Sequence, residues 1–370
     1  MDALPPPAAV AGLTRSDPRQ PGITRQRRPG GFRYAGSSGA ELTDPGELQR
    51  IRDLAIPPAW TGVWISPDPL GHIQATGVDG RGRTQYRYHQ RWREQRDAQK
   101  FSHMLRFAGA LPALREATVH DLRRRGLGRD RVASAAVRLI DLGLFRIGGE
   151  RYAELDHHYG ATTLEKRHVT VTRDGLRFDY VAKEGRRRTV TVTDPAVRPV
   201  VRALARSGNG LAPLFCWQRA GTWHELHSHD VSGYIAARAG GHFTAKEFRT
   251  WNATVLMALL LADAAPAATG RRRGQVVTTS VRGVADWLGD TPAVARASYI
   301  DPQLISRYLA DGRLPGIPQL PVSLPAPVEA ESAVATLLGR AGTRLSSGLT
   351  GVTGPPGPRE ISPSRFGAHG

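Results

Sequence analysis

The chain has 370 residues, 40% of them apolar, which is enough for two domains with sizeable cores. Lysine and arginine number 51 against 33 acidic residues, so the formal net charge is +18 and the pI is near 11.0. The single cysteine, Cys216, excludes an intrachain disulfide framework and a multi-cysteine zinc site. The charge favours a polyanionic partner, with nucleic acid first, because basic side chains that neutralise phosphates release condensed counterions.

Targeting and membrane signals are missing from the sequence pattern. The start, "MDALPPPAAVAGL", has neither the basic region nor the long apolar core of a signal peptide. The most apolar run, residues 255–262, is too short to span a bilayer. We therefore expect a cytoplasmic protein, associated with the nucleoid and without a membrane partner. No phosphate-loop motif is present, so nucleotide hydrolysis is not indicated.

The N-terminal part is predicted to contain a basic arm and a small β-rich module. Residues 1–29 are rich in Pro, Arg and Gly without apolar periodicity, which is typical of a disordered segment. Residues 30–89 include "IPPAWTGVWISPDPLGHIQATGVDGRGRTQYRYH", where apolar and polar residues alternate between Pro and Gly turns. This pattern predicts a β-rich module that ends near His89.

Helices and then a small sheet are predicted next. In "RDRVASAAVRLIDLG" the apolar residues recur on one helix face, and Gly143 can end the helix. The stretch "KRHVTVTRDGLRFDYVAKEGRRRTVTVTD" then contains three short runs of β-branched and aromatic residues, separated by RDG and KEG. We expect a three-stranded antiparallel meander with Lys183 at a hairpin tip.

Further helices are predicted after the meander. Asp194-Pro195 is a helix start with Pro at the first position, and Ser228 is typical of an N-cap. The sequence TAKE, which begins at Thr244, forms a capping box ahead of an apolar helix.

The last predicted helices complete an α+β protein. Residues 276–288 form one, and Thr291-Pro292 opens a short helix that ends at Tyr299. The fold class is thus a small β-rich module, residues 30–89, followed by a mainly helical domain with an embedded three-stranded sheet, residues 90–312. Residues 313–370 are rich in Pro, Gly and Ser and are expected to be mostly disordered, with "VEAESAVATLLGRAG" as one short helix candidate.

Four polar residues stand at the edges of these elements in a combination that suits transfer of a phosphodiester onto tyrosine. Nearby guanidinium groups favour the phenolate of Tyr299 and neutralise the phosphate that it must approach. Arg146 and Arg249 can also stabilise the charge of a five-coordinate phosphorus. A lysine such as Lys183 can protonate the leaving sugar oxygen as general acid. This chemistry requires neither a metal nor another cofactor.

Six motifs in order resemble type IB DNA topoisomerases, specifically the poxvirus-like and bacterial branch. The motifs are "IPPAW", "GRTQYRYH", "RIGGERY", "YVAKEG", "KEFRTWN" and "LGDTPAVARASYIDP", and the resemblance covers about residues 30 to 312. It implies an ATP-independent enzyme that cleaves one strand of duplex DNA through a 3′-phosphotyrosyl bond, lets the end swivel and reseals it. It also implies a monomer that closes a clamp on double-stranded DNA.

The resemblance implies a role for each site residue. Tyr299 would be the nucleophile, Arg146 and Arg249 the phosphate clamps, and Lys183 the general acid, while residues 90–312 would be the catalytic domain. The residues implied in DNA contact are Arg83, Gln85, Tyr86 and Tyr88. The fifth catalytic position, usually His or Asn in this family, is here Asp290. An ionised carboxylate repels phosphate, so Asp290 must be protonated, turned away or employed in holding Arg or Lys, or activity is reduced.

Several alternatives remain open at this point. A tyrosine recombinase uses similar chemistry, although "IPPAW" and "GRTQYRYH" fit the topoisomerase module better. A DNA-binding clamp with catalysis weakened by Asp290 is the rival outside the enzymes. At the hairpin, residues 186–188 are arginines that could contact the DNA backbone in place of Lys183. The "HELHSHD" cluster lacks the spacing of a metal site, so no metal is expected.

Overall fold

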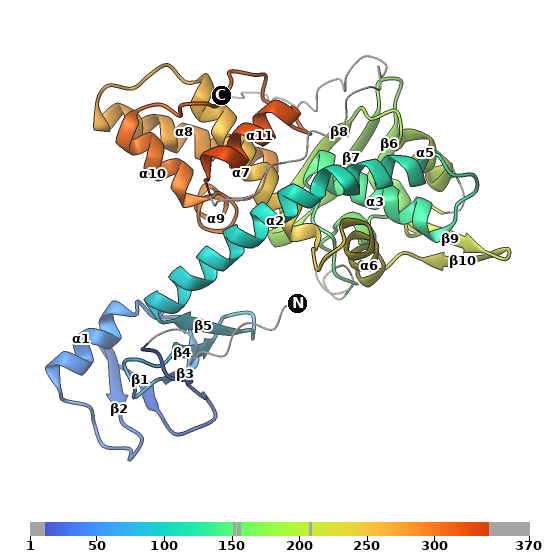
Figure 1. The fold of residues 1–370 in the computed structure, drawn as a ribbon. Helices are drawn as coiled ribbons and strands as arrows, with labels where there is room; N and C mark the ends of the chain where they lie inside the picture. The colour runs from blue at the N-terminus through green and yellow to red at the C-terminus, as the bar shows by residue number, and fades with distance from the viewer. Residues whose placement is uncertain (1–11, 151–152, 154–156, 207–208, 340–370) are drawn as a thin grey trace, which may run out of the picture. The chain divides into compact units, whose positions relative to one another are not determined.

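The computed structural model describes residues 12–150, 153, 157–206 and 209–339. The chain divides into two compact units, residues 1–101 and 102–370. The division falls inside one 33-residue helix, α2 (Gln90–Leu122), which is drawn in cyan in Figure 1. The two units are considered separately below.

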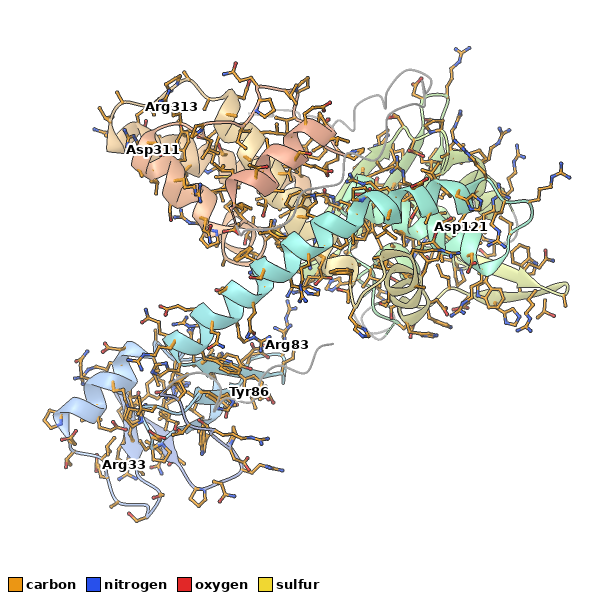
Figure 2. All side chains as sticks on the ribbon, in the orientation of Figure 1. Arg33, Arg83, Tyr86, Asp121, Asp311 and Arg313 are labelled. Atoms are coloured by element: carbon orange, nitrogen blue, oxygen red, sulfur yellow. The ribbon has the colours of Figure 1, made fainter. Side chains whose placement is uncertain are left out.

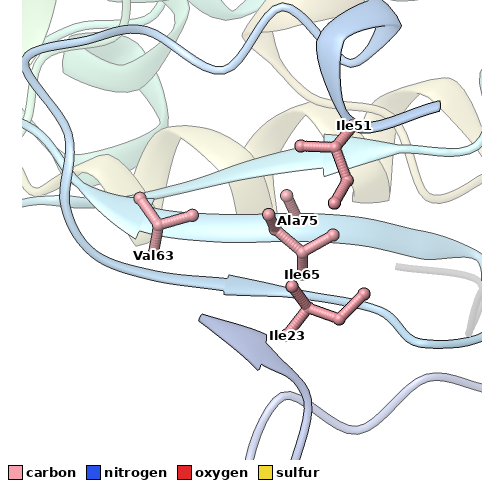
Figure 3. Packing of buried hydrophobic residues seen from close by; sticks show 5 residues of the cluster. All are labelled: Ile23, Ile51, Val63, Ile65 and Ala75. Carbon is pink, nitrogen blue, oxygen red and sulfur yellow. The ribbon is translucent and has the colours of Figure 1, made fainter. Parts of the chain in front are cut away.

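The first unit is built on a five-stranded antiparallel sheet with the strand order β2-β1-β3-β4-β5. The strands are β1 (Ile23–Arg28), β2 (Gly31–Ala35), β3 (Thr61–Ile65), β4 (Ile73–Val78) and β5 (Thr84–Tyr88). One helix, α1 (Pro45–Asp53), covers the sheet; its N-terminus is capped by Asp44, whose carboxylate accepts the Glu47 amide at 2.7 Å. The resulting core is shown in Figure 3 and contains Ile23, Ile51, Val63, Ile65 and Ala75.

The first strand corrects the expectation of a disordered arm over residues 1–29. β1 pairs with both β2 and β3, and its Ile23 is 4% exposed in the core. The sequence of this strand lacks an apolar alternation because Arg25, on the same face as Ile23, is partly buried. Its guanidinium donates to the carbonyl oxygens of Ile56, Pro57 and Trp60 and lies over the Phe32 ring. Residues 1–11 of that expected arm lie outside the described residues.

The second unit combines the predicted three-stranded antiparallel sheet with helices. The sheet has the order β6-β7-β8, with β6 (Val169–Val171), β7 (Leu176–Val181) and β8 (Arg187–Val192). A separate hairpin, β9 (Cys216–Arg219) with β10 (Thr222–Glu225), was not predicted. The helices after α2 are α3 (Arg129–Gly143), α5 (Arg198–Arg206), α6 (Ser228–Ala239), α7 (Ala245–Asp263), α8 (Gly270–Leu288), α9 (Pro292–Ser298), α10 (Pro302–Asp311) and α11 (Val328–Leu337). The α+β class is confirmed.

Helix starts agree with the predictions in part. The Thr244 capping box is confirmed ahead of α7, because Thr244 Oγ1 accepts from the Lys246 amide and Glu247 reaches back to the Thr244 amide at 2.7 Å. The α6 N-cap is His227 rather than Ser228. At Asp194 the carboxylate caps a turn, and the α-helix itself begins later, at the start of α5.

The C-terminal segment corrects the expected boundary at residue 312. Helix α11 packs against α7, and Glu331, at 5% exposed, is one of its buried residues. Arg115 of α2 donates two hydrogen bonds to Glu331 and two to the equally buried Asp141 of α3. The ion pair could not be predicted from the sequence, because Glu331 lies beside the apolar Ala330 and Val334 on the buried face and its partner Arg115 is more than two hundred residues away. Residues 340–370 lie outside the described residues.

Replacing Glu331 should remove this ion pair. We expect Glu331→Leu to lower the free energy of unfolding by roughly 3 kcal/mol, because Arg115 would lose one of its two buried counterions. The measurement is a urea unfolding curve of the full chain. Glu329→Gln, on the exposed side of the same helix, should leave the curve unchanged. Equal losses in both variants would contradict the assigned role of Glu331.

Candidate active site

Tyr299 lies at a corner between two short helices. Thr291 caps α9 by accepting the Val294 amide, and Pro292 occupies the first turn. Tyr299 forms the C-cap, where its carbonyl oxygen accepts from Thr254 Oγ1 of α7 at 3.1 Å. Asp301 then caps α10, so the Asp-Pro pair ends one helix and begins the next. The corner thus fixes the backbone of a tyrosine whose position the sequence correctly predicts.

Arg249 reaches this tyrosine from the first turns of α7. The arginine is 3% exposed, and its Cζ lies 5.0 Å from the centroid of the Tyr299 ring. Its two terminal nitrogens donate to the carbonyl oxygens of Leu144 and Leu288. These acceptors end α3 and α8, so Arg249 is fixed by two helix termini that lie far apart in the sequence.

Arg146 reaches the same tyrosine from the other side, just after α3. Its Nη1 donates to Tyr299 Oη at 3.2 Å. The Arg146 backbone is held by the Ala161 amide, which donates to its carbonyl oxygen at 2.7 Å. Gly160 permits this approach, since a Cβ there would lie 2.7 Å from the same oxygen. The Arg146 side chain remains 26% exposed, so a substrate phosphate can reach it. Residues 151–152 of the "RIGGERY" motif are not among the described residues.

Asp290 joins the two arginines. Its Oδ1 accepts from Arg146 Nη2 at 2.6 Å, and its Oδ2 accepts from Arg249 Nη2 at 2.7 Å. Of the arrangements considered from the sequence, the structure has the carboxylate employed in holding arginine. Asp290 therefore occupies donor positions that two clamping arginines would offer to a phosphate.

The electrostatic balance of the site favours the phenolate of Tyr299. Burial alone would raise the pKa of the Tyr299 hydroxyl, but the charges of Arg249 and Arg146 outweigh it, so the pKa lies below its ordinary value. Asp290 acts in the opposite direction, because its charge raises that pKa. The arginines therefore favour the ionised form of the hydroxyl, and Asp290 moderates the effect.

Lys183 has the predicted position on the β7–β8 hairpin, but the structure does not bring it to the other site residues. Its side chain is 58% exposed, and its Nζ lies 3.9 Å from Glu184. The tip is a tight turn in which Glu184 has a φ of 66° and Gly185 a φ of 72°. The lysine thus stands on an exposed turn of the second unit, and among the described residues no hydrogen bond or ion pair joins it to Tyr299.

The four residues expected to contact DNA lie in the first unit, where two of them bind a carboxylate and the other two stack on each other. Arg83 donates to Asp79 through Nε and Nη2, and Gln85 donates to the same carboxylate. Tyr86 and Tyr88 stack on one face of β5, with ring centroids 5.9 Å apart. Figure 2 labels Arg83 and Tyr86, the latter 46% exposed. The edge strand β5 thus presents the exposed Tyr86, which stacks on the partly buried Tyr88, and a basic turn precedes it.

Two residues at the site were missed from the sequence. Thr254 lies within an apolar helix run, and a single hydroxyl there gave no signal of its contact with the Tyr299 carbonyl. Arg188 was considered only as a DNA contact, but its guanidinium donates to backbone carbonyls at the ends of α3 and α8. The alternation of strand β8 could have separated it from its neighbours on the outer face.

The described residues offer neither a metal cluster nor a helix that could span a membrane. Within the described ranges, no group of three or more His, Cys, Asp or Glu side chains could hold a metal ion. His227 of the "HELHSHD" cluster instead contacts Glu150, with Nδ1 2.8 Å from the carboxylate. None of the helices in the described part of the chain has the length and apolar character needed to cross a bilayer.

Comparison with known proteins accounts for this arrangement. Residues 89–308, more than half of the chain, match the catalytic core of eukaryotic DNA topoisomerase I, and residues 31–79 match the N-terminal domain of bacterial DNA topoisomerase IB. The "DNA topoisomerase 1B" of Acanthamoeba polyphaga mimivirus is 28% identical over 285 residues, which cover 75% of this chain and 85% of the relative. The N-terminal match favours a topoisomerase over a tyrosine recombinase. The chain therefore belongs to the type IB DNA topoisomerases, in their poxvirus-like and bacterial branch.

Proposed function

We propose that this type IB topoisomerase relaxes supercoiled duplex DNA with Tyr299 as its nucleophile. The observation that supports this most directly is the placement of the Tyr299 hydroxyl, which accepts a hydrogen bond from Arg146 while its ring lies against Arg249. Two guanidinium groups at a buried phenol lower its pKa and provide donors for a phosphate. The arrangement suits attack on phosphorus.

In the proposed reaction, Tyr299 Oη forms a bond to phosphorus and the bond from phosphorus to the 5′-oxygen breaks. The phenol proton goes to solvent, and the departing 5′-oxygen receives a proton from an acid. The products are a 3′-phosphotyrosyl bond and a free 5′-hydroxyl. The covalent bond conserves the energy of the phosphodiester, so the reverse attack reseals the strand without ATP. Between the two steps the free end swivels.

The two arginines would act on the charge that develops during this step. As phosphorus becomes five-coordinate, negative charge accumulates on its non-bridging oxygens, and preorganised donors stabilise it more than they stabilise the ground state. Arg249 is fixed by helix-end carbonyls, and the Arg146 backbone is tied to residue 161. Asp290 keeps the two guanidinium groups together in the free protein.

Lys183 is proposed as the general acid, delivered by its hairpin. It would have to approach the leaving oxygen when DNA is bound, because in the free protein its side chain is exposed and pairs with Glu184. The rate at which Lys183 donates its proton to the leaving oxygen would then depend on the charges of the nearby phosphate and of the basic site. The exposed turn that carries it is suited to such an approach.

We further propose that the protein acts as a monomer on double-stranded DNA in the bacterial cytoplasm, close to the nucleoid. The net charge of +18 supports contact with the DNA backbone. Stacked Tyr86 and Tyr88, with Arg83 and Gln85 beside Asp79, are the proposed contacts of the first unit. Phosphate contacts of this kind position the protein and carry no sequence information by themselves.

Removing the Tyr299 hydroxyl tests the proposal. We expect the parent protein to relax negatively supercoiled plasmid in EDTA without ATP and to form a covalent adduct with DNA that detergent traps. Tyr299→Phe should do neither, because its ring has no oxygen for phosphorus, while its DNA binding stays unchanged. Tyr308→Phe, a second buried tyrosine in α10, should retain both activities. Adduct formation by Tyr299→Phe would assign the nucleophile elsewhere.

Replacing Lys183 tests the general acid. We expect Lys183→Ala to slow adduct formation by roughly 10²–10⁴-fold, since that is the usual contribution of a positioned acid. A duplex with sulfur in place of the leaving 5′-oxygen should restore most of the rate, because a thiolate leaves without a proton. The rates are measured in single turnover at a cleavage site mapped with the parent. A defect that persists with the sulfur substrate would exclude this role.

Neutralising Asp290 distinguishes an active enzyme from a weak clamp. We expect Asp290→Asn to increase adduct formation by roughly tenfold, because phosphate would then displace a neutral amide, which keeps one acceptor oxygen for arginine, instead of a charged carboxylate. Asp286→Asn, on the exposed face of α8, is the matched control and should behave as the parent. A slower Asp290→Asn would mean that the carboxylate supports catalysis.

A further inference from the structure

Arg188 has an inward-facing guanidinium that the chemistry above does not use. It lies on β8, five residues after Lys183 on the same hairpin. Its neighbour Arg187 points outward: that side chain is 77% exposed and pairs with Asp179 on β7. Alternation along a strand places the two side chains on opposite faces of the sheet. The structure therefore separates them, although the sequence "GRRRT" does not.

The Arg188 guanidinium binds four backbone carbonyls. Nη1 donates to Leu144 at 3.1 Å and to Leu288 at 3.0 Å. Nη2 donates to Gly143 at 2.6 Å and to Trp287 at 2.9 Å. These carbonyls come from the last turns of α3 and α8, where the final acceptors of a helix have no partner inside it. One side chain thus satisfies the open ends of two helices.

A cation suits this place for a second reason. The aligned peptide dipoles of a helix leave partial negative charge at its C-terminus, and Arg188 faces two such ends at once. These four hydrogen bonds all go to backbone carbonyls, and the Phe145 ring lies 5.7 Å from its Cζ. Burial lowers the pKa of Arg188, but a guanidinium stays charged. The backbone carbonyls are therefore its compensation.

The same carbonyls also hold the clamping arginine. The Leu144 oxygen accepts from Arg188 and from Arg249, and the Leu288 oxygen does the same. Leu144 adopts a left-handed conformation with a φ of 51°, which is costly for a residue with a side chain. The two arginines stabilise that conformation, because both donate a hydrogen bond to the Leu144 carbonyl oxygen.

We infer that Arg188 is a positioning residue for DNA cleavage. It ties the hairpin that carries Lys183 to the helix ends that precede Arg146 and Asp290, and it fixes the carbonyls that orient Arg249. Arg188 acts through these residues and has no contact with the reacting atoms. The inference rests on the proposed roles of Tyr299 and the two clamping arginines.

A lysine cannot replace Arg188 in this position. The planar guanidinium offers several donors in a fixed fork, whereas an ammonium offers three donors from a single point. Arg188→Lys keeps the charge at the helix ends but cannot bridge four carbonyls on two helices. The substitution therefore removes the geometric function and retains most of the electrostatic one.

The first test compares Arg188→Lys with Arg187→Lys, which alters the next residue of the same strand. Single-turnover adduct formation on plasmid, with protein in excess and detergent to trap the product, should fall by about 10²-fold in Arg188→Lys, the effect expected from a displacement of about 1 Å. DNA affinity should remain within about twofold of the parent, since the charge is kept. Arg187→Lys should match the parent in both measurements.

Melting temperature separates positioning from a general loss of folding. Both variants should be folded at the assay temperature, as shown by a single cooperative transition above it. An Arg188→Lys protein that is folded, binds DNA and cleaves at the parent rate would overturn the inference. So would a loss of cleavage that is matched by an equal loss of DNA affinity, because that result assigns Arg188 to binding.

A second measurement does not depend on cleavage. The phenol titration of Tyr299 is obtained from ultraviolet difference spectra against Tyr299→Phe in each background. If Arg188 orients the clamping arginines, Arg188→Lys should raise the pKa of Tyr299 towards its ordinary value, and Arg187→Lys should not change it. An unchanged titration in Arg188→Lys would overturn the inference. A parent that titrates as described but forms no adduct would instead refute the proposed function.

Discussion

Arg249 is a charge buried in the middle of the second unit, and a buried charge is tolerated only when its surroundings compensate it. The compensation comes from four directions: the carbonyl oxygens of Leu144 and Leu288, the carboxylate of Asp290 and the ring of Tyr299. Leu144 precedes Leu288, Asp290 and Tyr299 by more than a hundred residues of chain. Burial of this one guanidinium therefore requires that the C-terminal ends of α3, α8 and α9 meet at the first turns of α7.

This requirement explains why the site is largely formed before DNA arrives. Each partner of Arg249 is also held by another contact: Leu144 and Leu288 by Arg188, Asp290 by Arg146, and the Tyr299 backbone by Thr254. A catalytic group gains most when its partners are fixed before the reaction, because no reorganisation is then needed in the transition state. The Lys183 side chain is the exception, because it is exposed at the tip of its hairpin and its ion pair is with the likewise exposed Glu184.

The sequence predicted the elements that bring these residues together better than it predicted the contacts between them. Local signals were sufficient for the β6–β8 meander, for the Thr244 capping box and for the position of Tyr299, because turns and caps depend on neighbouring residues. The β1 strand was assigned to a disordered arm, because the partly buried side chain next to Ile23 on its inner face is Arg25. The α11 helix was a candidate, but its packing against the rest of the second unit was not predicted, because the ion pair of Glu331 with Arg115 joins residues far apart in the sequence.

The bond between Asp290 and the two arginines could not be derived from spacing. Asp290 and Arg146 are far apart in the sequence, and a carboxylate in this position allowed three arrangements. Arg188 was hidden for a related reason: three consecutive arginines have the same composition whether they face solvent or the protein interior. Their alternation along β8 gives Arg187 a partner on β7 and gives Arg188 the carbonyls at the ends of α3 and α8. The sequence thus identified the candidate residues, and their contacts became clear only from the fold.

The carboxylate of Asp290 also sets the formal charge that the site presents to its substrate. Two guanidinium groups and one carboxylate leave a single positive charge, which balances one phosphodiester and nothing more. When a phenolate adds to that phosphodiester, the five-coordinate species carries two negative charges, so the preassembled site is one cation short. The ammonium of Lys183 would supply that charge on arrival of the hairpin. In such a site, neutrality is reached only with every element in place, and a phosphate held by the arginines alone would be cut slowly.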